Sequence, residues 1–515
     1  MKRKKAQPVF KPYVMGQPSL IPQDLAEIIP HDHVVRVIHE TIENIDLGKL
    51  MERYKGGGTS SYHPRMMLKV LVYAYTQRIY SSRQIAKALR ENIYFMWLSG
   101  HNRPDFRTVN DFRGKTLQGL IQEIFEAVLE VLAEAGYVNF KEYFIDGTTI
   151  EANARKSSYV WAKNAKRYQA QLSKKVEELL EEVERANEAD DKKYGDKDLP
   201  EMGEDAKIDS KKIKKKIDEL NERLRNMPED KQVKKVVKKL EKEYLPRQEK
   251  YEEQERLLDG RSSYSKTDPD ATFMRLKEDR NQAEPRPRPG YNVQTGTENQ
   301  FVVGFSVHRR PGDMRCFKPH METLKRYRAQ LPQKIIGDAG YGSEENYEYL
   351  EQAQVESYLK YPGFDLRRPK RFRLEQFAYD AETDAFRCPE GRTMQYQYSR
   401  EQRSESGFVG QADVYECVDC GGCALRAQCT RSQRNRQLEV NWNLVRLRSQ
   451  VRESLQSEDG LRLRSRRGVE VESVFGNIKQ NMGFRRFMLR GMEKVTIEWG
   501  LLCLAHNMKK LATFS

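Results

Sequence analysis

The sequence predicts a mixed α/β protein whose core is interrupted by two insertions, and three patterns along the chain lead to this prediction. Two short apolar runs, 143–149 "YFIDGTT" and 334–341 "KIIGDAGY", have the composition of buried strands that each stop on an aspartate. A Lys- and Glu-rich stretch with a narrow apolar seam separates the two runs. A cysteine-rich segment follows the second run.

The N-terminal part, residues 20–135, is predicted to be helical. The segment "HPRMMLKVLVYAYTQRIY" has one broad apolar face, and "SSRQIAKALRENIYFMWLSG" reads as a helix that begins at a serine cap and stops at Gly100. Short helices joined by "SGHNRPD" favour a DNA-binding helix-turn-helix, although an ordinary helical bundle has the same spacing. The candidate DNA contacts in this part are Arg103, Arg107 and Arg113.

The first insertion, residues 165–258, is predicted to be coiled-coil-like. Apolar residues recur at alternating steps of four and three, while Lys and Glu fill most other positions. Clear examples are Ile213, Ile217, Leu220 and Leu224. We expect an antiparallel helical hairpin or a three-helix insert. It would serve as a dimer contact or DNA-clamping arm, or simply as a solvated structural insertion.

The remaining core elements follow in an order that predicts a mixed sheet. Residues 291–310 read as a hairpin, 314–331 as a helix, 334–338 as a strand, 343–353 as a helix, and 355–361 as a last strand. With the strand at 143–147 in front, this gives a sheet that carries the helical insertion between its first two strands.

Asp146 and Asp338 are candidate metal ligands because each ends an apolar run. If their strands are neighbours, both carboxylates reach one cleft, where they would repel each other without a cation and suit Mg²⁺ with one. A third acid is expected in 466–491, where Glu472 and Lys479 lie about two helical turns apart on one face. Glu470 is the rival, about 200° away around a helix. A plain amphipathic helix is the alternative; the basic residues around these positions are Arg466, Arg467, Arg485, Arg486 and Arg490.

Three segments, "YFIDGTTIEANA", "IIGDAGYGSEENYEYL" and "VEVESVFGNIKQNMGFRRFMLRG", resemble in order the acidic motifs of DDE-type bacterial insertion-sequence transposases. The resemblance implies an RNase H-like core and a catalytic triad of Asp146, Asp338 and Glu472 that binds two Mg²⁺ or Mn²⁺ ions. It implies cleavage and strand transfer at terminal inverted repeats, with Lys479 as the basic residue after the glutamate. Related transposases often carry an arginine four residues before this glutamate. Gly468 stands there, and Arg466 or Arg467 would take its place.

Five cysteines form a second candidate metal site. Paired short spacings with intervening glycines are typical of tetrahedral Zn²⁺ sites. The five are Cys388, Cys417, Cys420, Cys423 and Cys429. Cys420, Cys423 and Cys429 would bind with either Cys417 or Cys388, and the metal would stabilise a small module with little core of its own. An iron–sulfur cluster and free thiols are the alternatives.

The composition favours a polyanionic partner. The formal net charge is +15 and the sequence pI about 9.2, which agrees with binding of double-stranded DNA at transposon ends and targets. The basic N-terminal segment "MKRKKAQPVFKPYVMG" lacks the apolar core of a secretory signal, and we expect a cytoplasmic, nucleoid-associated bacterial protein that forms a homodimer and does not contact membranes. An RNase H-like nuclease without joining activity and a domesticated, non-catalytic DNA-binding protein are the alternative functions.

The expected domains are a helical DNA-binding domain at 1–135, the RNase H-like core at 136–164, 259–365 and 431–515, the helical insertion at 165–258, and the cysteine-rich zinc-binding insertion at 366–430.

Overall fold

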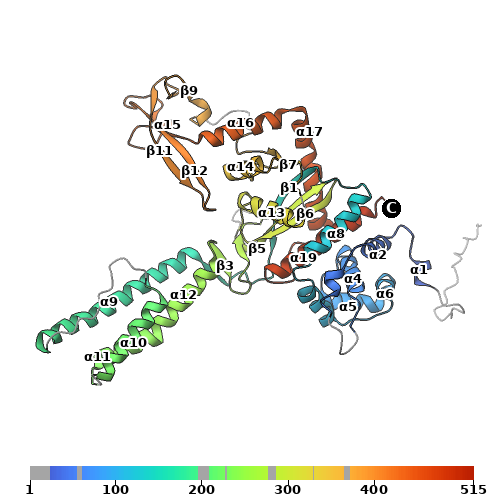
Figure 1. Ribbon diagram of the computed structural model, residues 1–515, viewed down its shortest axis with the longest axis horizontal. Coiled ribbons are helices and arrows are strands. Elements are labelled where there is room, and N and C mark those ends of the chain that lie inside the picture. The colour runs from blue at the N-terminus through green and yellow to red at the C-terminus, as the bar shows by residue number, and fades with distance from the viewer. Residues whose placement is uncertain are drawn as a thin grey trace, which may run out of the picture.

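The computed structural model describes residues 24–54, 61–194, 208–226, 229–276, 286–328, 330–364 and 372–514. The basic N-terminal segment considered above lies outside these residues. Figure 1 shows a central sheet with a helical region on one side, a long helical arm, and a cysteine-rich part at the end of another helix. The predicted mixed α/β fold with a helical N-terminal region is confirmed.

The central sheet is mixed, with antiparallel pairing on one side of β1 and parallel pairing on the other. Strands β6, β5 and β1 pair antiparallel, β1, β7 and β8 pair parallel, and β4 adds to one end of β5. Its strands are β1 (Glu142–Glu151), β4 (Thr272–Met274), β5 (Arg288–Glu298), β6 (Phe301–His308), β7 (Lys334–Gly337) and β8 (Glu356–Leu359). The crossover helices are α13 (Met314–Tyr327) and α14 (Glu344–Gln352), the latter capped by Ser343. The two apolar runs therefore lie side by side, because β1 and β7 are neighbours.

The N-terminal helices share one hydrophobic core with the sheet and with the last helix of the chain. The helices are α1 (Leu25–Ile28), α2 (Val34–Asn44), α3 (Gly48–Met51), α4 (Pro64–Thr76), α5 (Ser82–Glu91), α6 (Ile93–Ser99), α7 (Phe106–Asp111), the π-helical turn η1 (Phe112–Thr116) and α8 (Ile121–Glu134). The helix expected over 81–100 is two helices, since Asn92 ends α5 and caps α6. Gly100 ends α6 with φ of 53°, as its position predicts.

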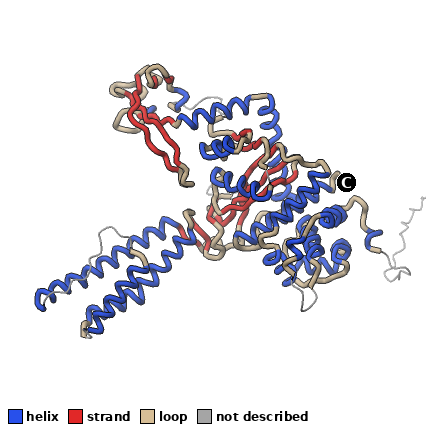
Figure 2. The backbone as a smooth tube through the Cα atoms, viewed as in Figure 1, coloured by secondary structure: helices blue, strands red, loops and turns tan. Residues whose placement is uncertain are grey.

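The helical insertion forms a three-helix arm with its own core. Two outward helices pack against a third that returns to the sheet with a π-helical turn in its middle (Figure 2). Its elements are β2 (Tyr159–Trp161), α9 (Ala162–Tyr194), α10 (Ser210–Asn226), α11 (Lys231–Lys239), η2 (Leu240–Tyr244), α12 (Leu245–Leu258) and β3 (Ser263–Ser265). The narrow apolar seam of the sequence is buried between these helices, with Val176 and Ile217 at 1% and 5% exposure.

The cysteine-rich part is a second sheet that precedes the C-terminal helices. Its elements are η4 (Leu374–Gln376), β9 (Ala378–Asp380), β10 (Ala385–Arg387), β11 (Thr393–Arg403), β12 (Val409–Cys417), α15 (Arg426–Cys429) and β13 (Gln437–Val440). The C-terminal elements are α16 (Trp442–Gln456), α17 (Glu458–Arg467), η5 (Gly468–Glu472), α18 (Ser473–Gly476), η6 (Asn477–Asn481) and α19 (Met492–Leu511). Among the described helices, none combines the length and the apolar character that crossing a membrane requires.

Candidate active site

The parallel pairing of β1 with β7 brings the two candidate aspartates together. Phe144 pairs with Ile336, and the same register two residues further along places Asp146 beside Asp338. One detail of the prediction is wrong: Asp146 lies inside β1, which continues to Glu151, and not at a strand end. The strand continues because its second half pairs with β5 beyond the point where β7 has ended.

Arg467 at the end of α17 lies between the two carboxylates. Its Nη2 atom is 3.5 Å from Oδ2 of Asp146 and 3.9 Å from Oδ2 of Asp338. The side chain of Arg467 is only 19% exposed, so these are partly desolvated charges. A cation therefore already occupies the space between the two acids, and the donor chemistry of this pair fits a divalent metal ion.

Glu472 and Glu470 have different surroundings. Glu470 is 4% exposed and structural: its Oε1 is 2.9 Å from Nη2 of Arg466 and its Oε2 accepts a hydrogen bond from the backbone of Gln300. Glu472 is exposed and, among the described residues, has no hydrogen bond or ion pair. Of the two glutamates, Glu472 is therefore the one whose carboxylate is accessible.

The helix that carries Glu472 is not a plain α-helix. Two π-helical turns, Gly468–Glu472 and Asn477–Asn481, flank a single α-helical turn. Each π turn accommodates one extra residue relative to an α-helix. The first one follows Arg467 directly, which explains how an arginine five residues before Glu472 reaches the aspartates. Lys479 lies in the second, and its Nζ donates to the backbone oxygen of Thr149 in β1 at 3.4 Å.

The other basic residues near this helix differ in the ion pairs and hydrogen bonds that they form within the protein. Arg466 binds Glu142 and Glu470. Arg486 approaches Glu151 at 3.8 Å, and Arg490 donates to the backbone oxygen of Asn153 at 2.6 Å. Both contacts attach the segment after η6 to the end of β1. Arg485 is exposed and donates to the side chain of Gln480.

A buried polar network below the aspartates was not visible in the sequence. Gln294 of β5 and Asn292 both donate to Oδ1 of Asp313, at 2.9 and 2.8 Å. Tyr341 donates to Gln294 at 2.5 Å, and burial, then the charges of Asp313, Asp146 and Asp338, raises the pKa of its hydroxyl. This network requires the glycine at position 147, because a Cβ there would lie 2.3 Å from Asp313. In the sequence, the only sign of this network was the presence of polar residues inside an otherwise apolar hairpin.

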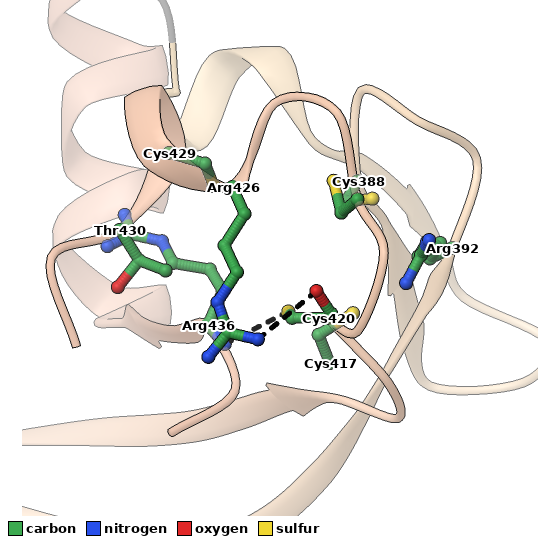
Figure 3. Close-up of a pocket in the computed structure, with 9 residues that line it drawn as sticks. Cys388, Arg392, Cys417, Cys420, Arg426, Cys429, Thr430 and Arg436 are labelled. Atoms are coloured by element: carbon green, nitrogen blue, oxygen red, sulfur yellow. Dashed lines mark hydrogen bonds between the residues drawn. The ribbon is translucent and has the colours of Figure 1, made fainter. Parts of the chain in front are cut away.

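The cysteine-rich part brings all five candidate cysteines to one small pocket, a space of about 20 Å³, which is room for one ion or water molecule. Figure 3 shows Cys388, Cys417 and Cys420 around this space. Burial and a hydrogen bond with Cys420 raise the pKa of the Cys417 thiol to about 11. Because the thiolate and not the thiol is the metal ligand, a metal ion that binds here must displace this proton.

The structure does not show an assembled metal centre. Within the described ranges, no group of three or more histidine, cysteine, aspartate or glutamate side chains is gathered closely enough to hold a metal ion. This applies both to the acidic triad and to the cysteines.

The three arginines predicted to bind DNA in the helical region lie in different places. Arg103 and Arg107 are exposed, and Arg107 lies over the ring of Phe106. Arg113 is 2% exposed and donates to the hydroxyl of Tyr75 and to the backbone of Tyr80. It therefore stabilises the core and does not present its guanidinium to DNA, so it is removed from the candidate DNA contacts.

Two family models of transposases match separate parts of the chain. A family model described as "Transposase DDE domain" matches residues 387–512, and one described as "Transposase domain (DUF772)" matches residues 23–115. A comparison with curated proteins gave no match. The first match includes Arg467, Glu472 and Lys479, while Asp146 and Asp338 precede it.

The two domains define a class of enzyme, the polynucleotidyl transferases that move DNA. The chain carries a transposase DDE domain, which belongs to this class, and an N-terminal transposase domain. A DDE domain implies an RNase H-like core and the use of divalent metal ions.

Proposed function

We propose that this transposase binds the terminal inverted repeats of an insertion sequence and catalyses cleavage and strand transfer with Asp146, Asp338 and Glu472. The observation that carries the proposal is the convergence of Asp146 and Asp338 on the guanidinium of Arg467. Two carboxylates on adjacent parallel strands, with a third acid and a lysine on one facing helix, form a suitable set for phosphoryl transfer.

The residues have distinct roles in this proposal. Asp146, Asp338 and Glu472 would hold two Mg²⁺ or Mn²⁺ ions, which when bound activate the attacking hydroxyl and stabilise the leaving oxygen. Lys479 lies beside the end of β1 and would bind a phosphate of the reacting strand. Arg467 holds the two aspartates until the cations replace it, and its guanidinium then becomes available to the DNA backbone.

The test is a cleavage assay on duplexes that carry the inverted repeats flanking the coding region. Asp338→Asn and Glu472→Gln should abolish Mg²⁺-dependent nicking while DNA binding is retained, because the amides keep the shape but lose the charge. Glu470→Gln is the matched control, two residues from Glu472, and should nick normally if it folds. Normal nicking by Asp338→Asn would overturn the assignment.

Two outcomes would favour the other functions. Cleavage without joining of pre-cleaved ends would indicate an RNase H-like nuclease, and binding without any metal-dependent cleavage would indicate a domesticated DNA-binding protein.

The surrounding parts have proposed roles that follow from this function. The cysteines would draw together to bind structural Zn²⁺, because five thiols line one small space that has no carboxylate, although Arg392, Arg426 and Arg436 also line it. DNA contacts are proposed for Arg103 and Arg107 in the helical domain, 1–135, and for Lys479, Arg466, Arg467, Arg485, Arg486 and Arg490 around the Glu472 helix.

The domain division given above is retained as a proposal, with core segments 136–164, 259–365 and 431–515 and insertions 165–258 and 366–430. We also propose a homodimer that acts on DNA in the cytoplasm.

A further inference from the structure

An open pocket of about 350 Å³ lies where the helical arm joins the rest of the protein. Its walls are aromatic: Tyr159 and Trp161 of β2, Tyr168 of α9 and Tyr251 of α12. Tyr159 and Tyr168 are 43% and 45% exposed. Large aromatic side chains that remain exposed around one concavity indicate a binding site.

The aromatic walls are supported from behind. The ring of Trp161 lies 6.0 Å from that of Phe273, and Tyr159 lies 5.1 Å from the same phenylalanine. A small core that includes Val160 and Leu258 packs the strand β2 against the returning helix. The rings of Tyr159 and Trp161 are therefore held in place before any ligand arrives, which lowers the entropic cost of binding.

The rim of the pocket is polar and available. Asn164, Lys250 and Gln254 line it, and within the described part of the chain none of the three has a hydrogen bond or ion pair. The two amides can each donate and accept hydrogen bonds, while the ammonium group suits a phosphate. This combination matches the polar edge and the phosphate of a nucleotide.

One side of the pocket is strongly positive, whereas α12 on the other side carries Glu249, Glu252, Glu253 and Glu255 beside its lining residues. Residues 152–176 contain seven Lys or Arg residues and no Asp or Glu. One of them, Arg167, lies 4.9 Å over the ring of Tyr168. The same stretch leaves β1, which carries Asp146, and its Asn153 donates to the backbone of Met488 at 2.7 Å. The stretch that lines the pocket therefore follows β1 directly, and its Asn153 contacts the segment between η6 and α19.

We propose that this pocket receives one unstacked nucleobase of the DNA on which the transposase acts. The ring faces of Trp161 and Tyr168 stack on the base, Asn164 and Gln254 bind its edge, and Lys250 binds the adjoining phosphate. A base that leaves its stack is stabilised in this way irrespective of its sequence, because every base has a π face. This inference depends on the proposed function only in that DNA is the ligand.

The test uses the full-length protein and single-stranded oligo-dT that contains one 2-aminopurine. Trp161→Ala and Tyr168→Ala should each weaken binding by roughly 5- to 150-fold and abolish the fluorescence change of the bound 2-aminopurine. Trp161→Phe should retain both, because it keeps a stacking face. Tyr396→Ala on the exposed β11 strand, where the native ring is 44% exposed, is the matched control and should bind as the unaltered chain does.

Several results would overturn the proposal. The first is a loss of oligonucleotide affinity in Tyr396→Ala as large as in the pocket variants, and the second is unchanged oligonucleotide binding in Tyr168→Ala. The third is a change in the oligomeric state of Tyr168→Ala without a change in DNA binding, which would make the pocket a subunit contact. Thermal unfolding of each variant separates misfolding from loss of stacking, and Tyr168→Ala is the safer variant because its ring is nearly half exposed. The assay contains no metal and requires no cleavage, so its failure is distinct from failure of the catalytic assignment.

Discussion

Replacing Arg467 by glutamine should tighten the binding of divalent metal ions to the free protein. The guanidinium lies 3.5 and 3.9 Å from the two aspartates, and at an effective dielectric constant of about 20 each such pair attracts by roughly 4–5 kcal/mol. Desolvation and solvent screening offset most of this, leaving on the order of 1–2 kcal/mol. A metal ion must displace that interaction, so its loss corresponds to roughly 5- to 30-fold tighter binding.

The assay is titration of Mn²⁺ without DNA, followed by the paramagnetic resonance signal of the free ion. Arg466→Gln is the control, because this neighbouring arginine binds Glu142 and Glu470 and not the aspartates. Arg467→Gln should also unfold at a lower temperature when metal is absent, since Asp146 and Asp338 then repel without a counter-cation. Unchanged or weaker Mn²⁺ affinity in Arg467→Gln would refute the view that the arginine occupies the position of the metal.

Two further predictions concern residues away from the aspartates. Burial raises the pKa of Glu498 from 4.5 to about 7, so the folded state holds its proton more tightly than the unfolded chain, and stability should fall as pH rises from about 5 to about 7. Glu498→Gln should remove this part of the pH dependence, which amounts to about 3 kcal/mol of unfolding free energy at most. Melting temperatures measured across this pH range check the expectation, and identical pH profiles for both proteins would contradict it. Cys420→Ser should lower the amount of bound zinc, measured by elemental analysis, and expose residues 372–440 to proteolysis. The control Cys316→Ser should alter neither the zinc content nor the digestion of this part. A zinc-free native protein would contradict this expectation.

The proximity of Asp146 and Asp338 could be predicted from the sequence because it depends on local patterns. The apolar runs before Asp146 and Asp338 specify strands, and two strands separated by crossover helices tend to lie parallel and adjacent. The spacing of Glu472 and Lys479 similarly indicated a single helical segment. Each of these signals lies within a few residues of the acid that it identifies.

The features that were missed depend on contacts between distant segments. Arg113 is a charged residue that the sequence pattern places at a surface, but Tyr75 and Tyr80 receive its guanidinium in the core. The π-helical turns have no spacing signature, so the sequence could not show that Arg467 reaches the aspartates. Asp313 was invisible for the same reason, since its partners Asn292 and Gln294 lie on another element.

The position of α19 has a consequence for how the protein is made. This helix, Met492–Leu511, packs against α4, α8 and β6, and it contributes to the same hydrophobic core as the first described helices. The N-terminal region therefore cannot complete its packing until residues 492–511 have left the ribosome. Products that terminate before this helix should lack a stable fold, so they would have no activity on DNA.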